Sequence, residues 1–491
     1  MQNLGDNSTH TKEVHRIPVS ARFVEENASK DSGAYCRIES GWWTSKLTGP
    51  VIASAVIRLA LMALLIARNG IGSVSQADTM SYLEPGRNLL LHGRFMADGA
   101  PDLVRTPGYP LFLAVASLAG LPFAALVNLL ISVLTVILVW RLARAVSDDE
   151  RIALGAAWIF AFEPVSFTYS CVLLSESLFL ALLVFSMERL AVFLRSRRFF
   201  TLFAAGLWLT AATFVRPVTY YLPVALAVGL LVVFARIPSL RWKAPCVLLI
   251  SVLPWLAAWQ MRNWVETGYG GFSSIREVNL YFFVAADVKA RIEHRPSFAV
   301  TRELGYVNFT DHSGQSYLFQ PYLDLHPEQA GWSQGQRLAY MRSQAWNTLK
   351  TNAGVSLRAF IVHFFKMVFD PGAGSLDALI NPGDPKHVAG LLMNQGLAQG
   401  TIVLIRTSPA VAAEKAVFAF LLFALYFFAA RGVFSRRARN ASLWLLLGTS
   451  LYLITISAIA GGTDSRYRQP AMPFVCIFAA AGLRRGIKVP Q

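Results

Sequence analysis

Ten runs of mainly apolar residues dominate this 491-residue sequence, and each approaches the roughly 20 residues that a helix needs to cross a bilayer. Backbone polar groups in lipid must be satisfied internally, which only helices and closed barrels achieve, and no alternating barrel pattern appears. The sequence therefore predicts an all-α polytopic membrane protein with about ten transmembrane helices. The runs are Val51–Ala67, Phe123–Trp140, Ile152–Thr168, Val172–Leu194, Phe200–Val215, Tyr220–Ala235, Val247–Met261, Val417–Ala430, Ser442–Ala460 and Pro470–Leu483.

The formal net charge of +16 admits nucleic acid, an anionic membrane surface or an anionic ligand as a partner. No basic domain with interleaved aromatic residues is present, so nucleic acid is not predicted. Much of the charge lies in alternate short connections, which the positive-inside rule places in the cytoplasm together with both chain ends. Those connections hold Arg141 and Arg144, Arg195–Arg198, Arg236–Lys243, Arg431–Arg439 and Arg484–Lys488.

This topology divides the chain into four parts. We expect a cytoplasmic tail at 1–48, an N-terminal transmembrane module at 49–261 with a first exoplasmic loop at 69–121, an exoplasmic or interfacial segment at 262–414, and C-terminal helices at 415–491. Within the third part, Val355–Phe369 is apolar but carries charged side chains. We favour a helix in the membrane interface, because a true span would require Val388–Ile405 to cross as well.

Charged residues gather at the exoplasmic rims of the predicted helices, where they are costly and are functional candidates. Asp78 follows the first run, Glu176 and Arg216 lie at the ends of later runs, and Arg466 precedes the last run. Structural roles compete with this interpretation. Asp78 would serve as a helix N-cap, Glu176 as half of an ion pair, and the arginines would extend to the interface.

Together these groups favour transfer chemistry at a lipid phosphate. Guanidinium groups pair bidentately with phosphate, and a neighbouring carboxylate suits a general base that takes a proton from an acceptor hydroxyl. The cations would stabilise the departing phosphate while the acid activates the nucleophile.

The order of the motifs resembles GT-C-type membrane glycosyltransferases, in particular bacterial relatives of the dolichyl-phosphate-mannose:protein mannosyltransferases and of the lipid A aminoarabinose transferases. The similarity runs from about Val51 to Leu483. Its motifs are an aspartate in the first loop, RTPGYPLFLA from Arg105, SESLF around Glu176, VRP at Arg216 and SRYRQP from Ser465.

The resemblance implies a GT-C-like helix bundle that uses a polyprenyl-phosphate-linked sugar donor at the periplasmic face of a bacterial inner membrane. The acceptor would be an envelope glycolipid, a polysaccharide or a protein. Asp78 matches the family's catalytic acid. We assign the donor phosphate to Arg216, Arg466, Arg468 and Arg105, and supporting roles at the donor or acceptor site to Glu176, Tyr82, His363 and Lys366.

One departure concerns metal binding. Many relatives carry two adjacent acids in the first loop, whereas Thr79 follows Asp78 here. Fewer hard oxygen ligands are therefore available for a divalent metal, so no cofactor is assigned and the metal dependence stays open.

Two alternatives remain. An O-antigen polymerase or ligase would use a diphosphate-linked donor, with its functional residues in a large late loop and no acid in the first loop. A transporter or flippase for a lipid-linked sugar would place charges near the bilayer midplane on broken, repeated helices. The rim charges favour an enzyme. Arg58, inside the first run, is the exception, and we expect it to partner another helix.

Overall fold

The computed structural model describes residues 44–307, 315–382, 402–403, 405–406, 409–434 and 440–484. Within them, one antiparallel hairpin joins β1 (Met96–Ala97) to β2 (Ala100–Pro101), and the other elements are helical. The all-α prediction is therefore confirmed. Several predicted features lie outside the described residues: the tail before residue 44, most of Val388–Ile405, Arg436, Arg437, Arg439, Arg485 and Lys488.

All ten apolar runs are helical, but they differ in their capacity to cross a membrane. Among the described residues, six helical stretches are long and apolar enough. A seventh candidate combines two helices that meet at a bend of 56°. Three further runs form shorter helices, so the number ten is reached only if these cross as well. The six contain α2 (Thr48–Asn69), α5 (Leu121–Ser147), α8 (Glu176–Ser196), α11–α12 (Pro238–Arg241 and Lys243–Thr267), α22 (Pro409–Val433) and α23 (Ala441–Ile459); the bent pair is α6 (Glu150–Ala161) and α7 (Pro164–Ser170); the shorter helices are α9 (Phe199–Val215), α10 (Leu222–Val233) and α25 (Met472–Leu483).

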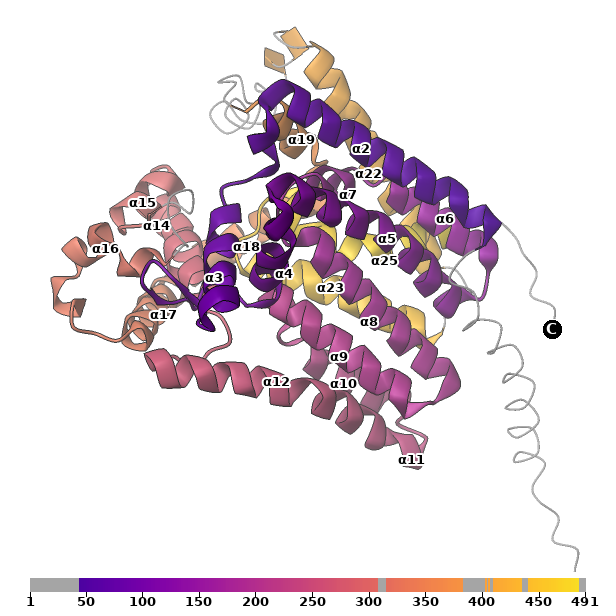
Figure 1. Cartoon of the computed structure of the whole chain (residues 1–491), viewed down its shortest axis with the longest axis horizontal. Helices are drawn as coiled ribbons and strands as arrows, with labels where there is room; N and C mark the ends of the chain where they lie inside the picture. The colour runs from indigo at the N-terminus through magenta and orange to yellow at the C-terminus, as the bar shows by residue number, and fades with distance from the viewer. Residues whose placement is uncertain are drawn as a thin grey trace, which may run out of the picture. The chain divides into compact units, whose positions relative to one another are not determined.

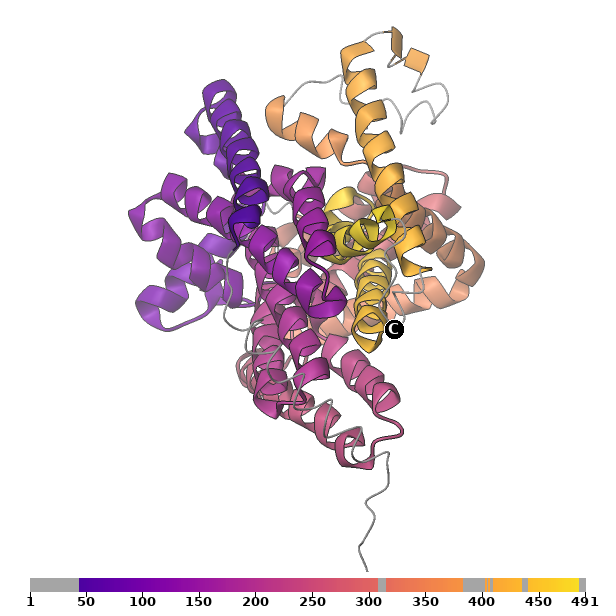
Figure 2. The same ribbon diagram turned by 90° about the vertical axis from the view of Figure 1, so that its right-hand side faces the viewer.

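The apolar helices pack mainly against one another. Helix α5 contacts α2, α6 and α8, and α9 contacts both α8 and α12. Helix α25 contacts both α6 and α22 (Figures 1 and 2). Helices α22 and α25 approach closely at Gly432 and Gly482, where an added Cβ would meet the backbone of the facing helix. Small residues of this kind allow close approach of membrane helices.

Arg58 on α2 is fully buried and confirms the expected partnership with other helices. Its guanidinium donates to Ser132 Oγ on α5 at 3.0 Å and to the carbonyl of Ala161 at 3.0 Å. Ala161 ends α6 at the bend before α7, so its carbonyl has no partner further along the helix. Arg58 therefore stabilises the break between α6 and α7.

The first loop contains two α-helices. Helix α3 (Thr79–His92) ends at Gly93 in the left-handed conformation, and α4 (Gly108–Ala116) packs against it. Gly108 lies against the end of α9, since an added Cβ would stand 2.7 Å from the carbonyl oxygen of Phe214. This contact places the first loop beside Arg216, the residue that follows α9.

Beyond α12, a further set of helices packs around an apolar core that includes Tyr281, Phe282, Tyr322 and Leu338, together with Leu103 from the first loop. Helix α18 contains the run Val355–Phe369. It is not among the candidate spans within the described residues and packs against α14, α23 and α24. The elements are α13 (Ile275–Asn279), the π-helix η5 (Leu280–Ala285), α14 (Ala286–Ile292), α15 (Ser297–Glu303), α16 (Gln320–Leu325), α17 (Gln334–Thr351), α18 (Ala353–Phe369) and α19 (Ala373–Ile380).

Two of the expected boundaries fall inside helices. The one between residues 261 and 262 lies within α12, and the one between 414 and 415 lies within α22. Helix α12 therefore carries the chain without interruption from the apolar bundle towards the helices that follow it.

Candidate functional site

A cavity of about 1420 Å³ lies where the first loop, the end of α9, α13, α17, α18 and the short helix α24 (Ser465–Arg468) meet. Of the predicted site residues, it is lined by Asp78, Tyr82, Arg105, Arg216 and Arg466. These residues come from distant parts of the sequence, so the fold brings together most of the charges that the rim positions predicted.

Asp78 binds two arginines. Its Oδ1 accepts from Arg105 Nη2 at 3.0 Å, and its Oδ2 accepts from both terminal nitrogens of Arg466 at 3.2 Å. Asp78 occupies the N-cap position of α3, but its side chain makes no capping hydrogen bond. The N-cap alternative therefore does not account for this carboxylate.

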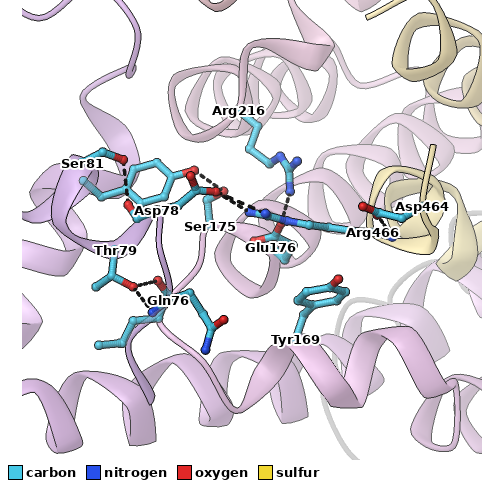
Figure 3. A network of polar contacts seen from close by, with 12 residues as sticks. Gln76, Asp78, Thr79, Ser81, Tyr169, Ser175, Glu176, Arg216, Asp464 and Arg466 are labelled. Atoms are coloured by element: carbon cyan, nitrogen blue, oxygen red, sulfur yellow. Dashed lines mark hydrogen bonds and ion pairs between the residues drawn. The ribbon is translucent and has the colours of Figure 1, made fainter. Parts of the chain in front are cut away.

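Glu176 holds the other side of Arg466. Its Oε1 accepts from Arg466 Nε and, at 2.7 Å, from Arg216 Nη1, and its side chain is almost fully buried. Figure 3 shows Arg466 extending between the two carboxylates, with Arg216 directed at Glu176. We call these five residues, Asp78, Arg105, Glu176, Arg216 and Arg466, the Asp78 cluster. It contains three guanidiniums and two carboxylates.

Two hydrogen bonds at Leu173 connect the loop that holds Asp78 to the segment before Glu176. Thr79 Oγ1 donates to the carbonyl of Leu173 at 3.1 Å, and the N–H of Leu173 donates to the carbonyl of Val74 at 2.8 Å. Leu173 lies just before α8, which begins at Glu176. Thr79 therefore attaches the Asp78 loop to α8.

A tight turn aims Arg105 at the cluster. Asp102 Oδ1 accepts from the N–H groups of Val104 and Arg105 at 2.7 and 3.1 Å. The Arg105 guanidinium then donates to Tyr82 Oη at 3.0 Å and lies over the Tyr82 ring, 4.1 Å from its centroid. Burial raises the pKa of Asp102 to about 7, although the two N–H groups and Arg105 act in the opposite direction.

The pKa of Asp78 is shifted the other way. Burial by itself would raise it, but the guanidiniums of Arg105 and Arg466 outweigh burial and lower the pKa to about 2. Asp78 is therefore ionised at neutral pH and, while both arginines hold it, is a weak base.

Arg468 lies apart from the cluster, contrary to its assignment to the donor phosphate. It is buried, does not line the cavity, and donates to the carbonyls of Met367, Val368 and Asp370 at the end of α18. These carbonyls have no partners within α18. Arg468 therefore connects α24 to α18, and this connection positions Arg466.

His363 and Lys366 also lie outside the cavity. The imidazole Nε2 of His363 faces Asp287 Oδ2 on α14 at 3.2 Å. Lys366 is exposed and, like His363, does not line the cavity. Both belong to α18, whose contacts direct His363 towards α14. The positions of His363 and Lys366 therefore do not support the roles assigned to them at the donor or acceptor site.

A second group of charges in the cavity was missed. Glu277 on α13 is almost fully buried, and it pairs with Arg276 at 2.5 Å and faces Arg342 of α17 at 3.9 Å. All three line the cavity, and we call them the Glu277 cluster. No motif marks them, because α13 and α17 are far apart in sequence and meet only through the fold.

Metal binding receives no support from the described side chains. Within the ranges given above, no group of three or more histidines, cysteines, aspartates and glutamates could hold a metal ion. The carboxylates of the Asp78 cluster are instead bound to guanidiniums.

Comparisons with known proteins add a distant structural likeness. No family model and no curated protein matches this sequence. The structure is similar to the crystal structure of ArnT from Cupriavidus metallidurans in the apo state, with a TM-score of 0.35 and 13% identity, covering 88% of this chain and 78% of that one.

Proposed function

We propose that this chain is a membrane glycosyltransferase that moves a sugar from a polyprenyl-phosphate donor to an acceptor. The observation that carries the proposal is the arrangement of Asp78 and Glu176 on either side of Arg466, at the edge of a large cavity. The motif order shared with GT-C-type enzymes supports the same conclusion. The acceptor class would be an envelope glycolipid, a polysaccharide or an exported protein.

The charges of the Asp78 cluster suit a donor with a single phosphate. Three guanidiniums against two carboxylates leave the cluster with one more positive than negative charge. A phosphodiester that links a lipid to a sugar carries one negative charge, which this excess would balance. A diphosphate donor brings more charge than the cluster offers, so the O-antigen-type alternative fits less well.

Donor binding would also activate the base. The phosphate and the Asp78 carboxylate compete for Arg466 and Arg105, the two groups that lower the pKa of Asp78. When the phosphate takes those guanidiniums, their field on Asp78 weakens and its pKa rises towards the range in which a general base works best. A weak base in the free protein thus becomes an effective one in the donor complex.

The transfer step is then a single displacement. The acceptor oxygen attacks the anomeric carbon and gives its proton to Asp78, while the bond from that carbon to the phosphate oxygen breaks. The electron pair stays on the departing polyprenyl phosphate, where Arg466, Arg216 and Arg105 stabilise it. The anomeric configuration is inverted.

We further propose that the cavity faces the periplasm from a bacterial inner membrane. The arginine-rich connections at the opposite ends of the helices support this orientation through the positive-inside rule.

Donor class provides the test. The purified full chain in lipid nanodiscs is given sugars linked to polyprenyl monophosphate or to polyprenyl diphosphate, and mass spectrometry follows the released lipid. We expect consumption of a monophosphate donor only. Consumption restricted to diphosphate donors would indicate the polymerase or ligase alternative. In proteoliposomes, movement of an unaltered lipid-linked sugar across the bilayer would indicate a transporter.

A further inference from the structure

The Glu277 cluster differs from the Asp78 cluster in how its arginines are presented. The side chains of Arg276 and Arg342 are 51% and 49% exposed, whereas the exposed fractions of Arg105, Arg216 and Arg466 lie between 11% and 21%. Both arginines line the same cavity as Asp78. The guanidiniums of Arg276 and Arg342 are therefore accessible to a ligand in the cavity, whereas those of the Asp78 cluster are mostly covered by their ion pairs.

Glu277 organises these arginines without neutralising both. Its Oε1 accepts from Arg276 Nε at 3.0 Å, and its Oε2 accepts from Tyr269 Oη at 2.8 Å. Arg276 Nη1 also donates to Tyr221 Oη at 3.1 Å. Two guanidiniums thus share one carboxylate, so the cluster carries one more positive than negative charge, and Arg276 is held in a defined position.

Aromatic faces lie in the same cavity. Trp264 from α12 and Trp346 from α17 line it and are 61% and 50% exposed. The C–H face of a sugar ring is apolar and stacks on the electron-rich face of an aromatic side chain. Exposed indoles in a cavity that also contains accessible guanidiniums form a suitable surface for a sugar that carries an anionic group.

We propose that Arg276 and Arg342 form a second anion site, which binds the carboxylate or phosphate of an acidic sugar on the acceptor. This inference rests on the proposed function and specifies its acceptor as an anionic glycan. Guanidinium groups bind either anion through paired charge-assisted hydrogen bonds. The two clusters divide the cavity between them, with the donor phosphate at Asp78 and the acceptor anion at Glu277.

Binding measured without donor tests this site independently of turnover. The probes are three diacylglycerol glycolipids that differ at one sugar carbon: glucosyl, glucuronosyl and glucosyl 6-phosphate. For the unmodified chain in nanodiscs, we expect either anionic glycolipid to bind at least tenfold more tightly than the glucosyl lipid. Arg276→Gln and Arg342→Gln should each remove most of that preference, and Arg276→Lys should restore part of it.

Lys350→Gln is the matched control, because Lys350 is exposed on α17 but does not line the cavity. It should retain the full preference. Arg342→Gln also separates binding from folding, since Arg342 only faces Glu277 at 3.9 Å and its loss leaves the Arg276 pair intact. The melting temperature of each variant identifies any loss of fold.

Three results would overturn the inference. The first is equal affinity for the neutral and anionic glycolipids. The second is a loss of polyprenyl phosphate binding in Arg342→Gln as large as the loss of glycolipid binding, which would make this a donor site. The third is arginine-dependent binding of an acidic peptide but of no glycolipid. Donor turnover in the same preparation reports separately on the proposed function.

Discussion

Helix α8 carries two buried glutamates, and each pairs with two arginines. Glu176 at its start binds Arg216 and Arg466, while Glu188, twelve residues and therefore about 18 Å along the helix, binds Arg141 and Arg189. Their exposed fractions are 1% and 2%. Burial and pairing are thus almost the same at the two positions.

The difference lies in what surrounds each pair. Arg466 reaches from Glu176 to a second carboxylate, Asp78, at the edge of the cavity, whereas neither Glu188 nor its arginines line the cavity. A buried ion pair alone therefore does not indicate a functional site. The distinguishing features are a second acid and open space next to the shared guanidinium.

The largest expected difference separates Glu176→Gln from Glu188→Gln. Each change removes the carboxylate from buried arginines, which costs roughly 3–5 kcal/mol for a buried pair, so both should lower the melting temperature. Only Glu176→Gln should also reduce donor turnover, by about 100-fold, because a small displacement of Arg466 misplaces the phosphate. Turnover per folded molecule, measured for both variants, checks this, and an equal loss in both would remove the distinction.

Arg466→Gln and Arg468→Gln test whether two arginines of the same short helix, α24, differ in their effect on donor binding. Hydrogen bonds to a charged group are worth about 1.5–3 kcal/mol, so Arg466→Gln should weaken donor binding by about tenfold or more. Arg468→Gln removes the guanidinium that donates hydrogen bonds to the α18 carbonyls, so it should mainly lower the melting temperature. If titration with a polyprenyl-phosphate sugar gave the same loss of affinity for both, Arg468 would belong to the site after all.

A smaller effect, on stability alone, is expected at Asp102. Its Oδ1 accepts from two backbone N–H groups in the turn before Arg105. Burial raises its pKa from 3.8 to about 7. The folded chain therefore holds this proton more tightly than the unfolded chain, and this group's contribution to stability falls as the pH rises from about 4 to about 7.

Asp102→Asn lacks that titration. Its melting temperature relative to the unmodified chain should therefore be higher at pH 8 than at pH 5. Thermal unfolding at the two pH values measures the change, and a difference between variant and parent that does not depend on pH would show that Asp102 does not titrate in this range.

Positions relative to the apolar runs were sufficient to predict most of the Asp78 cluster. Rim residues lie at the same depth in a helix bundle, so Asp78, Glu176, Arg216 and Arg466 were brought together in the prediction, and the structure joins them. The sequence also offers a reason to separate Arg468 from Arg466, because residues two apart on a helix do not face the same side.

Other features required the fold. The run Ile152–Thr168 reads as one span, but Pro164 begins α7, and the Glu163 side chain accepts from its first N–H groups, so a bend interrupts it. The Glu277 cluster depends on contact between α13 and α17. Neither the direction of His363 towards α14 nor that contact follows from local sequence patterns.

The proposed mechanism requires that the donor phosphate replace Asp78 on Arg466 and so turn Asp78 into the base. Donor affinity and turnover of Asp78→Asn, measured together with a polyprenyl-phosphate sugar, test it directly. Turnover should fall by at least about 100-fold, while donor affinity should stay the same or increase because the competing carboxylate is gone. Full turnover, or a loss of donor affinity as large as the loss of turnover, would contradict it.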